Sequence, residues 1–161
     1  MKKTIAIMQK IQLGVGGAFL LIFLLTVSYQ IIARYLGIQA MWTQDVAMYS
    51  FIWAVFMGSA AMVYEKRHFA FTSLGDSLKN QKAKAALSIL ISIIMLVFAV
   101  LLCYYGNTIT QKFWNYRWVQ IPEFKRGWTW LCLPVCGATS SIYLIAHIVE
   151  DVQKLVRGGK E

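Results

Sequence analysis

The residues that could do chemistry in this chain are few, and their spacing favours packing roles. His68 and His147 are candidate haem ligands, because a bis-histidine site needs two histidines on facing helices. The favoured interpretation at each position is a histidine that caps a helix or extends to the membrane interface. Cys103, Cys132 and Cys136 stand inside apolar runs without zinc spacing, so we expect them to pack as small hydrophobic side chains. We therefore predict no catalytic residue, no metal and no cofactor.

Acidic residues that could couple an ion to transport lie only at the borders of apolar runs. Asp45, Glu65 and Glu150 each border an uncharged run, and none lies in the middle of one. Pumps and ion-coupled carriers need titratable side chains that face the interior of the helix bundle. The sequence therefore argues against an enzyme and against a carrier that works alone.

The composition is that of a membrane protein. The chain is 58% apolar and 14% charged, whereas a soluble domain is about 45–50% apolar and about 25% charged. The net charge of +9 comes from Lys and Arg between apolar runs rather than on one helix face, which argues against nucleic-acid binding. With two prolines and no low-complexity tract, residues 1–161 are predicted to form a single membrane domain.

Four uncharged intervals are each long enough to cross a bilayer, at residues 11–33, 46–64, 85–111 and 127–149. A span needs about 20 apolar residues, and it must be helical to satisfy its backbone amides in lipid. The predicted fold class is therefore all-α integral membrane, with four transmembrane helices. The third interval exceeds the bilayer thickness and must tilt or protrude. Small residues near Gly14, Gly58 and Gly137 predict close helix packing, within the chain or against another.

The charges of the loops predict the orientation. Eleven Lys and Arg residues lie on the side of the two termini and five on the other side, so both termini are predicted to be cytoplasmic. The stretch 66–84 mixes basic and apolar residues. It is expected to form a short interfacial amphipathic helix, with a solvated basic loop as the alternative.

Tryptophans gather on the predicted outer side, in and around the loops. They either anchor the chain at the interface or form a surface for a partner, since Trp is favoured at both. The residues concerned are Trp42, Trp114, Trp118 and Trp128.

The most informative stretch runs from Arg34 to Leu74. Thr43 is expected to cap the second helix, and Asp45 to lie in its first turn, where the helix dipole favours an acid. The motifs in chain order are Arg34-Tyr35, Trp42-Thr43, Phe51-Ile52-Trp53, Gly58 with Ala60-Ala61, His68 and, in the fourth interval, Leu133-Pro134. Their order and spacing resemble the small membrane subunit of the tripartite ATP-independent periplasmic (TRAP) transporters. Gln44-Asp45 departs from the family's pair of glutamates, so Asp45 would carry their role alone. Thr72 and Ser73 stand where the family often has an acid.

The resemblance implies a non-catalytic scaffold of a sodium-driven organic-acid transporter in the bacterial inner membrane. Its implied partners are a large multispanning permease subunit, a periplasmic substrate-binding protein and membrane lipids. The substrate would be a C4-dicarboxylate, sialic acid or another sugar acid. The alternatives are a small redox or haem-anchoring subunit and a standalone membrane assembly protein. The candidate partner or lipid contacts are Arg34, Trp42, Asp45, Glu65, His68, Trp114, Trp118 and Trp128. Arg34 is expected to pair with Asp45 or with lipid phosphate, or to be a plain interfacial arginine.

Overall fold

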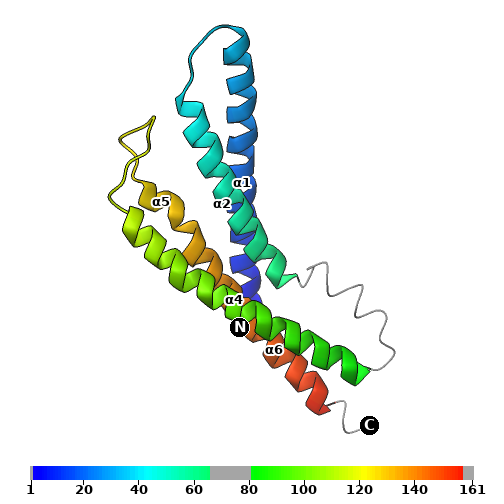
Figure 1. Ribbon diagram of the computed structural model, residues 1–161. Helices are drawn as coiled ribbons and strands as arrows, with labels where there is room; N and C mark the ends of the chain where they lie inside the picture. The colour runs from blue at the N-terminus through cyan, green and yellow to red at the C-terminus, as the bar shows by residue number, and fades with distance from the viewer. Residues whose placement is uncertain (1, 66–80, 158–161) are drawn as a thin grey trace.

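A computed structural model describes residues 2–65 and 81–157 (Figure 1). Its helices are α1 (Lys2–Tyr35), α2 (Trp42–Tyr64), α4 (Gln81–Phe113), α5 (Arg126–Trp130) and α6 (Cys132–Arg157). Within the described residues, four helical segments are long and apolar enough to cross a membrane, α5 and α6 together forming the fourth. The predicted all-α fold with four spans is confirmed. His68 and most of the predicted amphipathic stretch lie outside the described residues, and residues 81–84 belong to α4.

The helices run further than the uncharged intervals from which they were predicted. Helix α1 begins at Lys2 and passes through Lys10, and α4 has 33 residues, or about 50 Å at 1.5 Å per residue. Charges end the hydrocarbon segment but not the helix, since a lysine side chain can extend toward the interface. The fourth span is divided at Leu131, because Pro134 lacks the N–H that would bond the Trp130 carbonyl.

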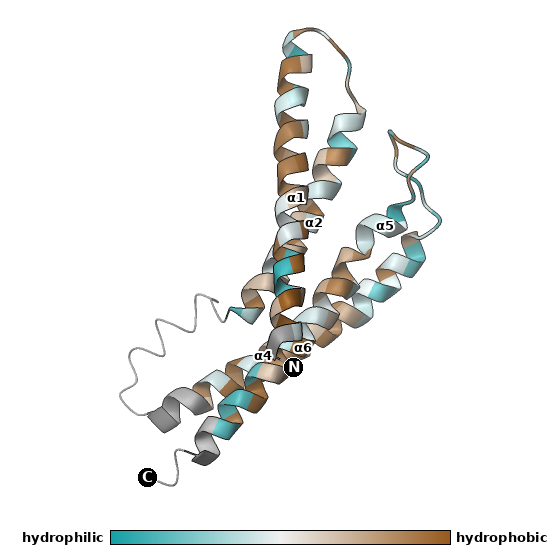
Figure 2. Cartoon of the chain, turned by 180° about the vertical axis from the view of Figure 1, so that it is seen from behind, coloured by the Kyte–Doolittle hydropathy of each residue, from teal (hydrophilic) through white to brown (hydrophobic). Residues whose placement is uncertain are grey.

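The chain forms two helical hairpins, α1 with α2 and α4 with α6, which meet mainly through α2 and α6. The hairpins diverge toward the connections 36–41 and 114–125, here called the loop end (Figure 1). In the most apolar 18-residue stretch of each span, 39% of the residues are buried in α2 and in the span formed by α5 and α6, whereas only 17% are buried in α1 and 11% in α4. Figure 2 shows long hydrophobic stretches along α1 and α4. The inner helices thus hold the chain together, while α1 and α4 expose apolar faces.

The α4–α6 seam is close because two glycines face backbone. A Cβ on Gly137 would stand 2.6 Å from the Cys103 nitrogen and 2.7 Å from the Ala99 oxygen. A Cβ on Gly106 would stand 2.7 Å from the Leu133 Cβ. No side chain fits at either glycine without separating the helices, so this seam is set by backbone contact.

The α1–α2 seam is built from aromatic pairs. Phe19 packs on Trp53 with ring centroids 5.3 Å apart, and Phe23 packs on Phe51 at 5.1 Å. Nearer the loop end, Tyr29 packs against Trp42 at 5.7 Å. These separations lie within the range of favourable aromatic pairing. The two hairpins therefore reach the same antiparallel arrangement by different contacts.

The turn between α1 and α2 is closed by Gly37, which has a φ of +71° that favours glycine. The Ile38 N–H bonds the Ala33 carbonyl and the Gly37 N–H bonds that of Arg34, which is the Schellman arrangement. The prediction that Thr43 caps α2 is wrong. The helix already begins at Trp42, and the Thr43 hydroxyl donates back to the Ala40 carbonyl at 2.6 Å.

Candidate partner interface

Asp45 is the residue that ties the loop end together. It lies in the first turn of α2, as predicted, and its side chain is buried. Its Oδ2 accepts a hydrogen bond of 2.9 Å from the backbone N–H of Gln120. The 114–125 loop is thereby fixed to α2, so the carboxylate that the helix dipole favours also joins the two hairpins.

Trp118 forms the second part of this connection. Its ring packs on Tyr49, one turn after Asp45, with centroids 4.5 Å apart. Its indole Nε1 donates to the Thr129 hydroxyl at 3.1 Å, which links the loop to α5. We call Asp45, Tyr49, Trp118, Gln120 and Thr129 the loop-end cluster.

The 114–125 loop forms a short backbone hairpin of its own, distinct from the two helical hairpins. The Arg126 N–H bonds the Tyr116 carbonyl at 2.7 Å, and the Trp118 N–H bonds the Phe124 carbonyl at 3.0 Å. The Arg117 guanidinium donates to the Pro122 carbonyl at 2.6 Å. Backbone pairing of this kind holds the aromatic side chains of the loop in defined positions.

Trp114 and Trp128 pack against each other beside this hairpin, with ring centroids 5.7 Å apart. Gly127 allows their approach, because a Cβ there would stand 2.5 Å from the Trp114 ring. Trp128 remains 59% exposed, so part of its ring is free for lipid or a partner.

The other predicted residues of the loop end lie apart from this cluster. Trp42 packs against Tyr29 and is still 44% exposed. Arg34 is exposed in the last turn of α1. The hydrogen bond that the Asp45 carboxylate accepts comes from the backbone N–H of Gln120. A contact of Arg34 with lipid phosphate therefore stays a prediction.

Glu65 lies at the opposite end of α2, close to the termini. It is exposed, and its Oε1 accepts a hydrogen bond of 3.1 Å from Gln9 of α1. His147 approaches the same end of α2, with Nε2 3.0 Å from the Tyr64 carbonyl. Tyr64 is the last residue of α2, so His147 is placed as a helix cap, one of the roles expected for it.

A polar group that the sequence did not reveal joins the two hairpins inside the helix bundle. The Tyr143 hydroxyl donates to Gln12 Oε1 at 2.6 Å, and Gln12 Nε2 donates to the Thr139 hydroxyl at 2.7 Å. Tyr143 and Gln12 are both buried. Polar side chains that bond across helices stabilise packing in lipid, so this triad is structural.

The polar contacts described above hold helices and a loop in position. Among them, no group of three or more His, Cys, Asp and Glu residues is placed to hold a metal ion. The free thiols of Cys132 and Cys136 are buried in helix packing. The loop-end cluster holds a loop on a helix and presents aromatic side chains beside it.

The fold and the site together define a multi-pass α-helical membrane protein whose ordered polar groups join helices and loops. The family model of the DctQ component of the tripartite ATP-independent periplasmic transporters matches residues 23–154. The chain therefore belongs to this family and is a small membrane component of a TRAP transporter. A search of the curated proteins finds no match.

Proposed function

We propose that this chain scaffolds the large transport subunit of a sodium-driven TRAP transporter and helps to dock its periplasmic substrate-binding protein. The substrate is an organic acid, of the class of C4-dicarboxylates, sialic acid or other sugar acids. Membership of a tripartite family supports a role in an assembly. Ion coupling is assigned to the large subunit, because Asp45, Glu65 and Glu150 of this chain border its apolar spans and none lies in the middle of one.

The observation that carries the scaffold role is the unequal burial of the four spans. Only 17% and 11% of the residues in the most apolar 18-residue stretches of α1 and α4 are buried, and nine large apolar side chains of α4 are 46–68% exposed. Phe98, for example, is 68% exposed and Val97 is 56% exposed. A component of an assembly must present a face to its partner, and these faces are continuous and apolar.

The docking role is assigned to the loop end. Trp128, Tyr116 and Val119 are 59%, 57% and 66% exposed there. Exposed aromatic side chains held by a rigid backbone hairpin are favoured at protein interfaces. The distribution of Lys and Arg supports a periplasmic position for this end and cytoplasmic termini.

Co-purification tests the scaffold role. The tagged chain, expressed with the large subunit and extracted in mild detergent, is expected to bring that subunit with it. Replacing Phe98 of α4 by Glu should reduce this recovery if α4 forms the contact, and Leu21→Glu on α1 is the matched variant on the other exposed face. A tagged chain recovered alone would contradict the scaffold role.

Transport in proteoliposomes tests the remainder. Uptake of the acid is expected to require an inward sodium gradient, both membrane subunits and the binding protein. Trp128→Ala should raise the binding-protein concentration needed for half-maximal uptake while leaving the membrane complex intact. Tyr35→Ala, at the last residue of α1, whose side chain is 89% exposed, is the control. An unchanged requirement in Trp128→Ala would contradict docking at this end.

A further inference from the structure

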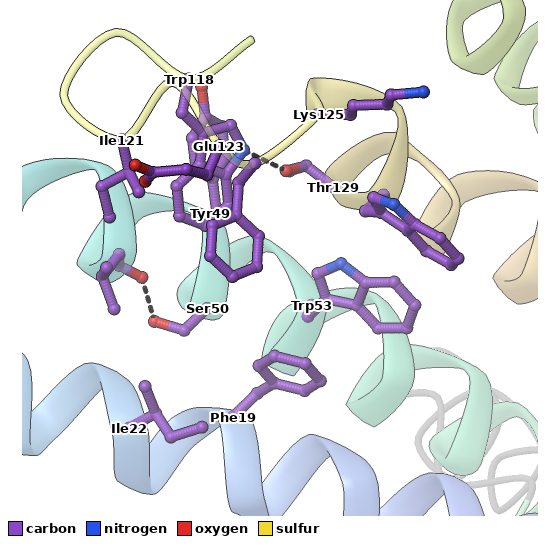
Figure 3. A pocket seen from close by; sticks show the side chains of 13 residues that line it. Phe19, Ile22, Tyr49, Ser50, Trp53, Trp118, Ile121, Glu123, Lys125 and Thr129 are labelled. Atoms are coloured by element: carbon purple, nitrogen blue, oxygen red, sulfur yellow. Dashed lines mark hydrogen bonds between the residues drawn. The ribbon is translucent and has the colours of Figure 1, made fainter. Parts of the chain in front are cut away.

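A cavity of about 710 Å³ lies in the angle between the two hairpins at the loop end. Its walls come from α1, α2, the 114–125 loop and α5 (Figure 3). The volume lies within the roughly 300–1,000 Å³ of pockets that accept small organic ligands. Phe19 and Ile22 form its lower side and Trp53 its middle in Figure 3. The cavity follows α2 from Val46 to Trp53, or about 10 Å along the helix axis.

The polar groups in the wall are already engaged. The Ser50 hydroxyl donates to the Val46 carbonyl, and the Trp118 indole N–H donates to Thr129 (Figure 3). A ligand seated beside them meets aromatic rings and aliphatic carbon. The body of the cavity therefore suits a hydrocarbon chain rather than a polar solute.

The upper edge of the cavity carries two opposite charges. Glu123 and Lys125 both border the cavity and are two residues apart in the 114–125 loop, and in Figure 3 the Glu123 carboxylate lies beside Ile121 while the Lys125 side chain extends to the other side, above α5. Both side chains are exposed, and both residues lie just before the fourth span, which begins at Arg126. A hydrocarbon slot with a carboxylate and an ammonium at its mouth is complementary to a zwitterionic lipid. Its acyl chain would fill the slot, its phosphate would face the lysine, and its amine would face the glutamate.

We propose that this cavity binds one molecule of an ethanolamine glycerophospholipid from the leaflet at the loop end. The lipid fills the angle between the hairpins with one acyl chain and is selected by its head group at Glu123 and Lys125. It thereby extends the contact between the hairpins beyond the loop-end cluster. No residue of α4 lines the site, and of the exposed apolar side chains of α1 it takes Ile22 but not Leu21.

Native mass spectrometry of the full chain tests this. The chain is reconstituted with equal amounts of phosphatidylethanolamine and phosphatidylglycerol of identical acyl chains, and the lipid that survives mild activation is identified. One retained phosphatidylethanolamine is expected. Ile22→Trp, which fills the slot, should lower its occupancy by about fivefold or more, since a packed cavity resists extra volume. Leu21→Trp is the matched control, because Leu21 is on the same helix, 57% exposed, and outside the cavity wall.

The charges at the edge are tested separately. Lys125→Gln should weaken retention of both lipids by roughly two- to fivefold, the range of a single exposed charge pair. Glu123→Gln should reduce only the preference for ethanolamine over glycerol, because glycerol carries no cation. Lys112→Gln, at an exposed lysine of α4 outside the cavity, should change neither.

Three results would overturn the proposal. The first is equal retention of the two lipids by the unmodified chain. The second is equal occupancy in Ile22→Trp and Leu21→Trp, which would indicate lipid bound elsewhere on the surface. The third is loss of the retained lipid when the chain is co-expressed with the large subunit, which would assign the cavity to a segment of that partner.

Discussion

The two hairpins have the same topology but are held by different means. In the α4–α6 pair, Gly137 and Gly106 let backbone meet backbone. In the α1–α2 pair, a Cβ on Gly16 would still stand 3.4 Å from the Gly58 nitrogen, and aromatic rings such as Phe19 and Trp53 add contacts at centroid separations above 5 Å. A seam built on backbone contact has no room for a side chain, whereas a seam of aromatic rings can adjust. From these contacts we infer that α4 and α6 form the rigid half of the chain and α1 and α2 the adaptable half.

The largest expected effect comes from a side chain in the rigid seam. Gly137→Leu must displace the backbone of α4 at Cys103 or Ala99, and overpacking of this kind costs about 3 kcal/mol or more. We expect a severe loss of folded protein and of apparent melting temperature in detergent. Gly14→Leu is the matched control, since nothing lies within 4 Å of a Cβ at Gly14. Similar melting temperatures for the two variants would refute the assignment of a rigid seam.

The next effect concerns the junction of the two hairpins at the loop end. Asp45→Ala removes the acceptor of the Gln120 N–H, and a hydrogen bond to a charged group is worth about 1.5–3 kcal/mol. The exposed position of Gln120 places the expected loss at the lower end of that range, about 1.5 kcal/mol. Faster amide exchange at Gln120 measures the release of the loop. Gln44→Ala, at the exposed neighbouring residue, should leave that exchange unchanged.

How well each feature can be predicted from the sequence depends on how far apart along the chain the residues that form it lie. The four spans are predictable, because hydrocarbon demands about 20 continuous apolar residues and marks its limits by charge. The ends of the helices are harder to predict, since Lys10 borders the apolar run but lies inside α1. Thr43 is a good cap by type, yet the chain enters α2 in helical conformation at Met41 and needs no side-chain cap there.

The candidate site is predictable only in part, for the same reason. Asp45 and Trp118 stand out by charge and by aromatic type. However, Asp45 and Gln120 are 75 residues apart, and their contact depends on how the second hairpin crosses the first. The Gln12–Tyr143 bond, across 131 residues, is equally hidden from local patterns. The spacing of Asp45 and Tyr49, one helical turn, was the available signal that both face the loop.

A smaller effect would measure how much the aromatic seam contributes. Phe19→Leu, Trp53→Leu and the double variant form a cycle whose coupling should be about 0.5–1.5 kcal/mol, the usual value for a ring pair. The apparent unfolding free energy in mixed detergent gives each term. The pair Phe19 and Phe51 is the control, because their partners are Trp53 and Phe23 and not each other. A coupling near zero for Phe19 and Trp53 would remove the aromatic account of the α1–α2 seam.

The smallest effect tests whether the polar triad inside the bundle joins the two halves. Tyr143→Phe removes the hydroxyl that donates to Gln12 while keeping the ring, so packing against Tyr64 is preserved. Hydrogen bonds between membrane helices average about 0.6 kcal/mol, because the unfolded chain in lipid also finds partners. We expect a loss of that size in unfolding free energy, with no change in the α4–α6 seam. Gln12→Leu should lose more, since it also leaves the Thr139 hydroxyl without its donor. If both variants were as stable as the parent, the triad would contribute nothing measurable, and the hairpins would be joined by the packing of α2 on α6 and by the contacts of Asp45 and His147.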